Sequence, residues 1–392
     1  MKILSVNAGS SSLKFTLFEM PEEKELISGV FERIGIENSF YTIKLNGEKI
    51  KKEAVLANHT DAVKILTQEL LDNNIVEDLS EIKAIGHRMV HGGEKYASSV
   101  LLTDEVIKTV EELSDLAPLH NPANLVGVRA FMEVIPDAVS VGVFDTAFHQ
   151  TMEEDKYLYP VPFEWYEDYG VRKYGFHGTS HKYVSQKMAE ILGKSDAKII
   201  TCHIGNGGSL AAVKDGKCID TSMGFTPNAG IIMGSRSGDI DASLIPYVMK
   251  KSGMSISDID TALNKKSGLL GISGVSSDSR DIEDGIKSGN SRCELAQKMY
   301  VDKIVNYIAM YYVELGGADA IVFTAGVGEN SISTRKQIVE KLDCLGIKLD
   351  EERNNVRGKE ALISSDDSKV LVYVIPTNEE LMIATDTYNL AK

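Results

Sequence analysis

Hydrophobic and polar residues alternate along the first part of the chain, which predicts strands. Five runs before residue 57 have the two-residue period of a half-exposed sheet: KILSV, LKFTLF, ELISGVF, FYTIKL and KIKKEAVL. In the second run Leu13, Phe15 and Leu17 fall on one face. Asn46-Gly47, between the fourth and fifth runs, favours a two-residue hairpin turn. The pattern predicts a β-meander.

The period of the apolar residues then lengthens to that of helices. From about Thr60, the stretch DAVKILTQELL places Ile65, Leu66 and Leu70 on one face. Further helices are predicted over roughly 104–115 and 121–134, and apolar strands over 84–90 and 138–144. A meander followed by alternating helices and strands predicts one mixed α/β sheet flanked by helices.

The same order of elements restarts at Lys198. The strand KIITCHI leads into a Gly/Asn loop, the strand LAAV, a hairpin turn at Asp215-Gly216 and the strand KCIDT. Later elements are helices at about 241–251, 257–264 and 291–315, a strand at 319–326 with a helix to about 343, and a strand at 370–375 with a last helix. The aromatic stretch 157–181 is expected to cross between the two halves. Residue identity between them is low, so the repeat is one of topology.

Length and charge limit the functions open to this chain. At 392 residues it favours two domains rather than one. Its formal net charge of −15 argues against nucleic acid or an anionic membrane as a general partner. Anionic substrates would therefore need a few placed Arg or Lys side chains, or a metal ion.

The cysteines and the apolar runs indicate the compartment. Cys202, Cys218, Cys293 and Cys344 are far apart with no C-x-x-C motif, which suits a reducing environment and provides no zinc motif. The N-terminal run ILSV is too short for a signal-peptide core, and no run approaches the ~20 apolar residues of a membrane helix. We expect a cytoplasmic protein.

Four stretches rich in Gly, Asn, Ser or Thr follow predicted strands: NAGSSS at 7, GNGGS at 205, AGVGENS at 325 and TNEE at 377. Such loops expose backbone N–H groups and hydroxyls that hold phosphate, at the sheet edge where α/β folds bind ligands. The first alone is equally compatible with a plain hairpin loop. Together the four indicate an extended phosphate-bearing ligand such as a nucleotide. Walker A, Rossmann and protein-kinase motifs are absent.

Several charged residues stand where the pattern would favour other residue types. Arg88 lies inside an apolar strand, Asp145 follows one, and Arg236 is in the loop MGSRSGD, which has no apolar period. Each has an ordinary alternative: a surface Arg in the first and third cases, and a helix N-cap for Asp145. Glu379, in TNEE, is either functional or a first-turn Glu favoured by the helix dipole.

Seven of the eight histidines lie between residues 87 and 203, mostly in polar clusters where elements end. His177 and His181 have the i,i+4 spacing that suits a metal, but no third ligand and no H-E-x-x-H motif accompany them. For His87 and His181 we therefore prefer hydrogen bonds to neighbouring polar groups.

These motifs resemble those of one enzyme family, the acetate kinases. VNAGSSSLKF at 6–15 resembles the first signature of that family, and IITCHIGNGGSLAAV at 199–213 its second. GHRMVHGGE, LAPLHNP, FDTAFH, YGFHGTSHKYV, MGSRSGD, TAGVGEN and TNEE resemble its remaining blocks, in the same order. The resemblance spans nearly the whole chain.

The resemblance implies a fold and a reaction. The fold is that of actin, hexokinase and the Hsp70 ATPase: two duplicated ribonuclease H-like α/β lobes with mixed sheets and a cleft between them. Residues 1–148 with the last helix, about 380–392, would form the N-terminal lobe, and 149–379 the nucleotide-binding lobe. The reaction is reversible transfer of the γ-phosphoryl group of ATP to acetate, directly in line, with Mg²⁺ or, as an alternative, Mn²⁺. A homodimer is also implied.

The resemblance further implies roles for the residues that match family motifs. Asn7 and Glu379 hold the metal directly or through water. The catalytic residues are Asp145, Arg88, His177, Arg236 and His120. The acetate pocket is lined by Arg88, Val90, Leu119, Phe176 and Pro227. The nucleotide contacts Lys14, His203, Ile204, Gly205, Asn206, Gly207, Asp278, Ser279, Arg280, Gly326, Val327, Gly328, Glu329 and Asn330.

The chemistry of acetate qualifies the role of Asp145. Acetic acid should titrate near the ~4.3 of a Glu side chain, so acetate is already an anion at pH 7 and needs no general base. We therefore expect Asp145 to orient Arg88 or a magnesium-bound water. Two other functions stay open: a propionate or broader short-chain acyl kinase on the same fold, and a nucleotide-switched binding protein of the Hsp70 kind.

Overall fold

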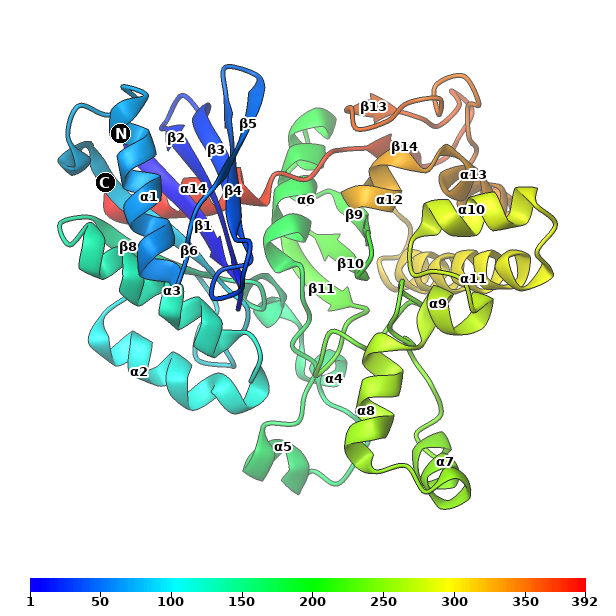
Figure 1. Ribbon diagram of the computed structural model, residues 1–392. Coiled ribbons are helices and arrows are strands. Elements are labelled where there is room, and N and C mark those ends of the chain that lie inside the picture. Colours follow the sequence, from blue (N-terminus) through cyan, green and yellow to red (C-terminus); the bar gives the residue numbers. More distant parts are fainter. The chain divides into compact units, whose positions relative to one another are not determined.

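The computed structural model describes all 392 residues, which divide into two compact units (Figure 1). The first unit comprises Met1–Gln150 and Asn378–Lys392, and the second comprises Thr151–Thr377. The chain thus leaves the first unit once and returns to it for its last helix.

The first unit is built on an eight-stranded mixed sheet. Its strands are β1 (Lys2–Ala8), β2 (Ser12–Glu19), β3 (Lys24–Glu32), β4 (Phe40–Leu45), β5 (Glu48–Glu53), β6 (Ile82–Met89), β7 (Val100–Leu101) and β8 (Val139–Phe144). They follow the order β5-β4-β3-β2-β1-β6-β8-β7. The first five are antiparallel neighbours, which confirms the predicted meander, whereas β6 and β8 run parallel to β1. Asn46 and Gly47 have positive φ angles, as the predicted turn requires.

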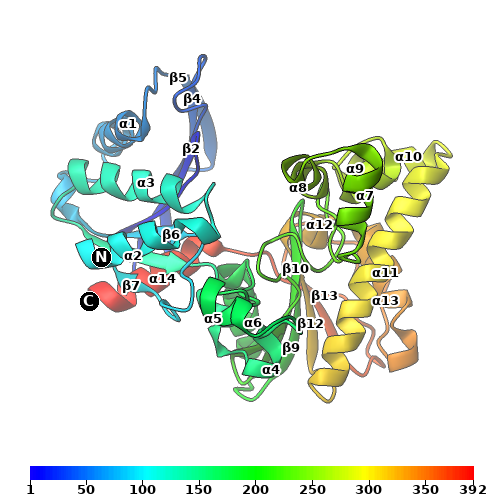
Figure 2. The same cartoon turned by 90° about the horizontal axis from the view of Figure 1, so that it is seen from below.

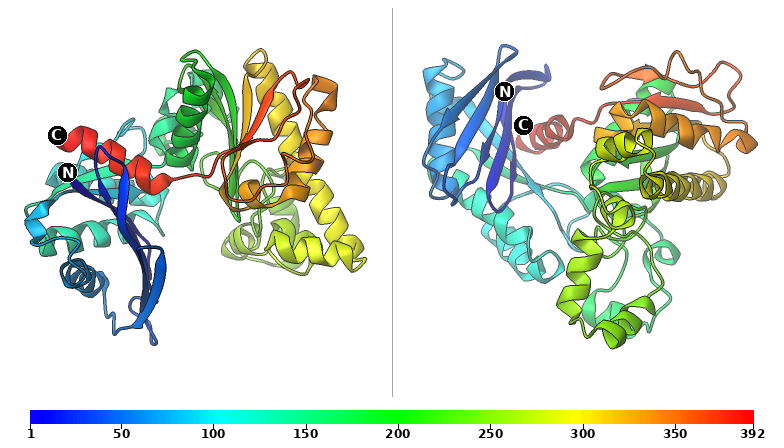
Figure 3. Two further views of the ribbon diagram at one scale, coloured as in Figure 1. Left: turned by 90° about the horizontal axis from the view of Figure 1, so that it is seen from above. Right: turned by 45° about the vertical axis from the view of Figure 1, so that its right-hand side comes forward.

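Helices cover this sheet on both faces (Figure 3). They are α1 (His59–Asp72), α2 (Asp104–Glu112), α3 (Asn121–Val134) and α14 (Glu379–Ala391), with short 3₁₀ turns at Leu79–Glu81, Leu113–Leu116 and Ala147–Thr151. Leu4 and Val6 of β1 pack in the core formed with α1 and α3, whereas Ile3 packs against α14. The alternation places the two sets of helices on opposite faces. Gly86 permits the approach of α14, since a Cβ there would lie 2.2 Å from Thr387 Oγ1.

The second unit repeats the strand order of the first. Its strands are β9 (Lys198–Ile204), β10 (Gly208–Lys214), β11 (Lys217–Thr221), β12 (Ala320–Thr324), β13 (Ala361–Leu362) and β14 (Leu371–Val374), in the order β11-β10-β9-β12-β14-β13. The three antiparallel strands β9 to β11 correspond to β1 to β3. The parallel neighbours β12 and β14 correspond to β6 and β8. The predicted duplication of topology is confirmed.

Helices also flank the sheet of the second unit. They are α4 (Glu154–Tyr157), α5 (Glu164–Tyr169), α6 (Gly178–Leu192), α7 (Leu244–Ser252), α8 (Ile256–Lys265), α9 (Gly268–Ser273), α10 (Ser279–Lys287), α11 (Ser291–Glu314), α12 (Ala325–Asn330) and α13 (Ile332–Glu340), with a 3₁₀ turn at Asp343–Leu345. The helices α6 and α11 pack on opposite sides of the sheet (Figures 1 and 2).

Two of the four predicted loops are wrong in detail. Asn7 and Ala8 extend β1 and pair with Lys14 and Leu13, so the first connection is a tight turn closed by Gly9 N donating to Ser12 O at 2.8 Å. AGVGEN is the helix α12 rather than a loop. In addition, the stretch 157–181 was expected to cross between the two halves, but it lies within the second unit, which begins at Thr151, and contains α5 and the start of α6. The helices α9 and α10 were not predicted. The glycines and charged residues of α9 and α10 interrupt the apolar spacing from which a helix is predicted.

Candidate active site

In the first unit, polar side chains meet at the ends of three adjacent parallel strands. Asn7 lies near the end of β1, Arg88 on β6, and Asp145 directly after β8. Arg88 Nη2 donates to Asp145 Oδ2 at 2.5 Å, and Arg88 Nη1 lies 3.4 Å from Asn7 Oδ1. Asp145 is buried, with 2% of its side chain exposed, so this is a largely desolvated ion pair. We call Asn7, Arg88, Asp145 and Glu379 the charge cluster.

Glu379 enters the charge cluster from the first turn of α14. Burial raises the pKa of Glu379 to about 7; the Asp145 carboxylate adds to this rise and the Arg88 guanidinium opposes it. Burial alone would lower the pKa of Arg88, but the carboxylates of Asp145 and Glu379 outweigh it and raise the pKa. The cluster therefore holds two carboxylates around one cation. Lys14 is exposed and paired with Glu380, and its charge also acts on the Glu379 carboxyl.

Two asparagines at the start of α3 hold the backbone around the charge cluster. Asn124 Nδ2 donates to Ala8 O at 2.7 Å, and its Oδ1 accepts from Val90 N at 3.1 Å. Asn121 Oδ1 accepts from His91 N and Nδ2 donates to His91 O. Neither asparagine was predicted to be functional, although their i,i+3 spacing in HNPAN was a usable signal. They fix the ends of β1 and β6 relative to each other.

The other predicted residues of the first unit differ in exposure. Val90 is buried just beyond the end of β6, while Leu119 and His120 are exposed at the start of α3, Leu119 to 74%. The hydrogen-bonding role preferred for His87 is wrong at one ring nitrogen: Nε2 has no partner and the ring packs edge-on against Phe131. Burial lowers the pKa of His87 to about 3.

In the second unit, three histidines form a hydrogen-bonded group behind the start of α6. His177 Nδ1 and His181 Nε2 both contact Ser209 Oγ, at 2.8 and 2.7 Å. His181 Nδ1 contacts Thr201 Oγ1 at 2.7 Å. The ring of His203 stacks on His177 with centroids 4.1 Å apart. We call His177, His181 and His203 the histidine cluster; the preferred hydrogen-bonding role of His181 is confirmed.

His177 has a strained backbone. Its φ of 57° lies in the left-handed region, which is uncommon for residues other than glycine, although Asn, Asp and His adopt it more often than the rest. It stands immediately before Gly178, the first residue of α6. Ala325, immediately before Gly326 at the start of α12, is strained in the same way with φ 64°. Strain of this kind often marks functional sites.

Arg236 lies beside the histidine cluster. A Cβ on Gly207 would lie 3.4 Å from Arg236 Nη1 and 3.8 Å from His177 Nε2, so both side chains border this glycine. Arg236 Nη1 donates to the carbonyl of Pro227 at 3.1 Å, and burial lowers the pKa of Arg236. Phe176, next to His177, is buried. Phe176 and Pro227 thus belong to the second unit, whereas Val90 and Leu119 belong to the first.

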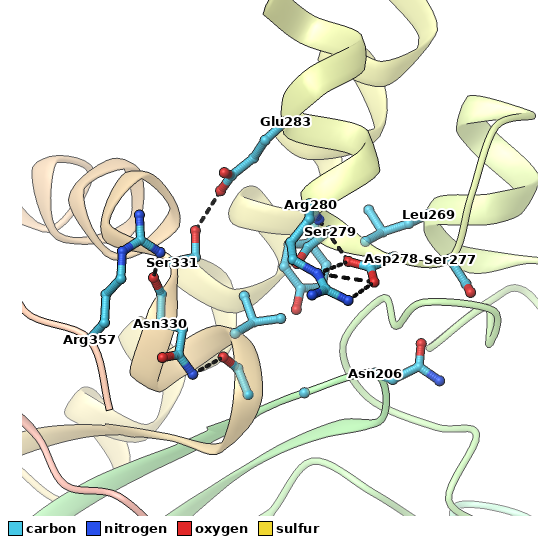
Figure 4. A pocket seen from close by; sticks show the side chains of 14 residues that line it. Asn206, Leu269, Ser277, Asp278, Ser279, Arg280, Glu283, Asn330, Ser331 and Arg357 are labelled. Carbon is cyan, nitrogen blue, oxygen red and sulfur yellow. Dashed lines mark hydrogen bonds and ion pairs between the residues drawn. The ribbon is translucent and has the colours of Figure 1, made fainter. Parts of the chain in front are cut away.

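A pocket of about 550 Å³ opens between α10, α12 and the loop after β9 (Figure 4). Eight residues predicted to bind nucleotide line it: Gly205, Asn206, Asp278, Ser279, Arg280, Gly326, Val327 and Asn330. Six lining residues were missed: Leu269, Ser277, Glu283, Tyr300, Ser331 and Arg357. Ser277 and Ser331 adjoin predicted residues and could have been found; Glu283 and Arg357 had no signal in the sequence.

Close backbone approach shapes the pocket on the Asn206 side. Gly234 N donates to Asn206 O at 2.9 Å, and a Cβ on Gly234 would lie 2.0 Å from Asn206 Oδ1 and 2.7 Å from Ser277 O. Opposite, Arg280 pairs with Asp278 and lowers the pKa of that carboxyl to about 2. Glu283 accepts from Ser331 Oγ at 2.6 Å and so joins α10 to the end of α12.

The remaining predicted nucleotide residues lie outside this lining. Glu329 Oε1 accepts from Ala325 N at 2.8 Å and from Thr377 N at 3.1 Å, so it holds the start of α12. Ile204 is fully buried in β9, and the carbonyl of Gly328 accepts from Arg335. His203 and Gly207 lie at the histidine cluster instead.

Arg335 supports the wall of the pocket from behind. It is fully buried on α13 and donates to Asn354 Oδ1 and to the carbonyls of Gly328, Asn354 and Val356, at 2.8 to 2.9 Å. Burial and the Arg357 charge lower the pKa of Arg335 to about 10. Arg335 thereby ties α12 to the segment that carries Arg357.

The structure contains neither a ready-made cluster of metal ligands nor a helix that could span a membrane. No group of three or more His, Cys, Asp or Glu side chains is arranged to hold a metal ion. His177 and His181 instead share Ser209 as a partner. None of the helices combines the length and apolar composition needed to cross a bilayer.

Comparison with known proteins extends over the whole chain. The model of the acetokinase family matches residues 2–385. The acetate kinase of Bacillus subtilis (strain 168) is 56% identical over 393 residues, which cover 100% of both chains. That of Geobacillus kaustophilus (strain HTA426) is 56% identical over 392 residues, covering 100% of this chain and 99% of the relative.

Solved structures agree with these relatives. The crystal structure of Porphyromonas gingivalis acetate kinase matches with a TM-score of 0.96 and 49% identity, covering 100% of both chains. A propionate kinase from Francisella tularensis matches with a TM-score of 0.93 and 42% identity, covering 99% of each. The predicted fold class, two duplicated actin/hexokinase-like lobes with mixed sheets flanked by helices, is confirmed. By its sequence and its fold, the chain belongs to the acetokinase family.

Proposed function

We propose that this protein transfers the γ-phosphoryl group of ATP to acetate, reversibly and directly in line, giving acetyl phosphate and ADP. The observation that carries the proposal is the Arg88–Asp145 pair at the ends of three parallel strands. A guanidinium fixed there by a buried carboxylate is suited to binding a second, incoming carboxylate or a phosphoryl group.

Two anions must meet in this reaction, so positive charge has to oppose their repulsion. Phosphoryl transfer asks the protein mainly for positioning and charge stabilisation. In the proposed reaction Arg88 and Arg236 contact the acetate carboxylate and the phosphoryl oxygens. Arg236 suits this role because its half-buried guanidinium is held by the Pro227 carbonyl and not by a carboxylate. His177 donates to a phosphoryl oxygen, with His120 near the same oxygens.

Asp145 orients Arg88 in this scheme and takes no proton from the substrate. Its Oδ2 lies 2.5 Å from Arg88 Nη2, a short charge-assisted contact. Acetate is ionised at neutral pH, with its acid titrating near the ~4.3 of Glu, so a general base has no proton to remove. The Asp145 carboxylate thus serves to hold the Arg88 guanidinium in position.

The charge cluster offers suitable oxygen atoms for a magnesium or manganese ion that accompanies ATP. Mg²⁺ prefers carboxylate and carbonyl-type oxygens together with phosphates and waters. The Asp145 carboxylate raises the pKa of Glu379, and this repulsion is what a cation would relieve. Asn7 and Glu379 would hold the ion, directly or through water. When bound, it offsets negative charge on the phosphates.

ATP binds with its adenosine in the pocket between α10 and α12 and its phosphates along His203 to Gly207. The pocket volume, about 550 Å³, lies within the range of small-molecule sites. Asp278, Ser279 and Arg280 line one side, and Gly326, Val327 and Asn330 the other. Lys14 approaches the nucleotide, with Glu329 and Gly328 acting through α12.

Acetate is the proposed acid, with Val90, Leu119, Phe176 and Pro227 meeting its methyl group. A propionate kinase is the second candidate, because one with that name matches at 42% identity over 99% of the chain. An apolar pocket discriminates one methylene by only ~1–3 kcal/mol, so wild type should use both acids with a modest preference for acetate. A homodimer acting in the cytoplasm is part of the proposal and stems from the family resemblance.

The test is a coupled assay of ADP release from ATP and Mg²⁺ with formate, acetate, propionate and butyrate. We expect the highest kcat/KM with acetate, and acyl phosphate formed in equal amount to ADP. A higher value with propionate would make this a propionate kinase. ATP hydrolysis that no acid stimulates would contradict the proposal and favour a nucleotide-switched binding protein.

Val90→Ala sharpens the choice of acid. Val90 is buried next to Asn124, which holds its backbone N–H, so shortening its side chain should open space without moving Arg88. We expect the ratio of kcat/KM for acetate over propionate to fall, mainly through KM. An unchanged ratio with a lowered melting temperature would assign Val90 to the core.

A further inference from the structure

A continuous chain of hydrogen bonds runs from the middle of the second sheet to His177. Thr201 on β9 contacts His181 Nδ1 at 2.7 Å, His181 Nε2 contacts Ser209 Oγ at 2.7 Å, and Ser209 Oγ contacts His177 Nδ1 at 2.8 Å. Thr201, His181 and Ser209 are each 0% exposed. Because water does not reach them, each of their protons must go to a neighbouring protein atom.

Each hydroxyl in this chain has one proton, which fixes the number of possible arrangements. Ser209 Oγ faces two ring nitrogens, so with neutral rings it donates to one and accepts from the other. Thr201 in turn donates to His181 Nδ1 or accepts from it. The protons therefore all point towards His177, or all point away from it.

The Thr201 hydroxyl decides between these two directions. If His181 Nδ1 donated to it, its own proton would have to go to Ala211 O, which lies 3.4 Å away. That exceeds the 2.5–3.0 Å of ordinary O–H···O bonds. If Thr201 donates to His181 Nδ1 instead, its proton lies in a 2.7 Å contact. The geometry favours protons that point towards His177.

This direction determines which nitrogen of His177 bears hydrogen. Thr201 donates to His181 Nδ1, His181 Nε2–H donates to Ser209, and Ser209 donates to His177 Nδ1. A neutral His177 then has its proton on Nε2. We propose that Thr201, His181 and Ser209 are positioning residues that hold His177 as a neutral donor through Nε2.

The charges around His177 favour a neutral donor. Arg236 and the Nε2 edge of His177 both border Gly207. The His203 ring, from β9, stacks on His177. His181, from α6, shares Ser209 as a hydrogen-bond partner with His177. A charged imidazolium beside the Arg236 guanidinium would be opposed by like-charge repulsion. The chain supplies an N–H donor without a second positive charge. This inference rests on the proposed function for its catalytic meaning, but not for the proton positions.

The proton positions can be measured directly in the folded protein. Long-range ¹H–¹⁵N correlation spectra of ¹⁵N-histidine-labelled protein distinguish the two neutral forms of each ring, and spectra of His177→Gln and His181→Gln assign the signals. We expect both His177 and His181 to carry hydrogen on Nε2 at pH 7.5. Hydrogen on Nδ1 of either ring would overturn the proposal, whether or not the protein phosphorylates acetate.

Three threonine variants test the consequence for catalysis. Thr201→Val removes the hydroxyl at nearly constant volume, Thr201→Ser keeps it, and Thr221→Val removes a buried hydroxyl on β11 that donates to Leu210 O at 2.9 Å and contacts no histidine. Removing a transition-state donor outright costs ~10²–10³ in kcat. For Thr201→Val, where the donor is loosened rather than lost, we expect kcat about tenfold lower, with both KM values within twofold.

The pH dependence separates this role from simple structural damage. In Thr201→Val the loss of kcat should be largest at alkaline pH and should shrink as pH falls, because an imidazolium carries an N–H on both nitrogens whichever neutral form the chain selects. Thr201→Ser should restore most of the activity. If Thr201→Val and Thr221→Val lose equal kcat with the same pH profile, Thr201 only packs the sheet and the proposal is wrong.

Discussion

The two units share one strand order but hold their polar side chains in different ways. In the first unit, Arg88 is paired with the buried carboxylate of Asp145. Burial raises the pKa of Glu379, and charge repulsion from the nearby Asp145 adds to this rise. In the second unit, the half-buried Arg236 is held by a backbone carbonyl, and the fully buried Arg335 is held by backbone carbonyls and an amide. A guanidinium held by carbonyls can attract an anionic ligand with its full positive charge. A guanidinium paired with a carboxylate is fixed more firmly, but the carboxylate cancels part of its attraction for the ligand. The two units therefore share a topology but differ in their arginines: one is held by a carboxylate and the others mainly by backbone carbonyls.

The strongest test of this comparison is to remove the paired arginine. In Arg88→Ala we expect kcat at least ~10³-fold lower, within the range for a transition-state Arg in phosphoryl transfer. Because Asp145 would be left buried and unpaired, the melting temperature should fall as well. Arg129→Ala is the control, since Arg129 lies on α3 and forms only an exposed pair with Glu111. Turnover within a few-fold of wild type would exclude Arg88 from catalysis.

Removing the carbonyl-held arginine should separate activity from stability. In Arg236→Ala we expect kcat ~10²–10³-fold lower, the loss expected for one transition-state donor. The melting temperature should stay near that of wild type, because no carboxylate loses its partner. Kinetics and thermal unfolding of Arg88→Ala and Arg236→Ala, side by side, give the measurement. Equal destabilisation of the two would remove the distinction drawn between them.

Asp145→Asn tests what the carboxylate contributes. The amide keeps an oxygen for Arg88 but loses the charge that holds the guanidinium, so kcat should fall about 10²-fold. A missing general base is often replaced as hydroxide concentration rises, but here the substrate has no proton to lose. The measurement is kcat from pH 6 to 10, with no selective recovery expected at the alkaline end. Strong alkaline rescue would show that Asp145 accepts a proton.

Arg335 tests whether the wall behind the pocket matters for nucleotide binding. In Arg335→Lys one ammonium replaces a fork with four hydrogen bonds, so α12 and Arg357 should lose their fixed spacing. We expect KM for ATP about tenfold higher and KM for acetate unchanged. Arg353→Lys is the control, because Arg353 contacts Ser364 and Asp366 but not α12. Parallel increases in both KM values would indicate general loosening of the fold.

The smallest effect concerns histidines and acid stability. Burial lowers the pKa of His87 to about 3 and of His91 to about 4, so between those values and about 6.5 the unfolded chain binds protons that the folded chain excludes. Stability is therefore fully present above pH 6.5 and is lost as pH falls below it. For His87 alone the loss should be about 1 kcal/mol between pH 6.5 and 5.5. His87→Leu should flatten the decline in melting temperature over that range; an unchanged slope would exclude His87 as its source.

Site residues could be predicted from the sequence where their place in a predicted strand also determines their place in the folded site. Arg88 and Asp145 could be identified because a charge interrupts or ends an apolar strand, and parallel strands bring such ends together. Glu283 and Arg357 could not, since they reach the pocket only through the packing of α10 and the segment after α13. AGVGEN became a helix although its glycines disfavour one, because Glu329 accepts from the first N–H of α12. Tertiary contacts outweighed local propensity there.

The return of α14 to the first unit has a consequence for the order of folding during synthesis. Until residues 378–392 leave the ribosome, the face of the first sheet that carries Ile3, Phe18, Val141 and Val143 has no cover. The second unit, encoded between the two parts of the first, is already complete by then. The usual sequence in which N-terminal domains finish first is thus reversed. Glu379 is the first residue of α14. The charge cluster of a nascent chain is therefore complete only when α14 has covered the first sheet.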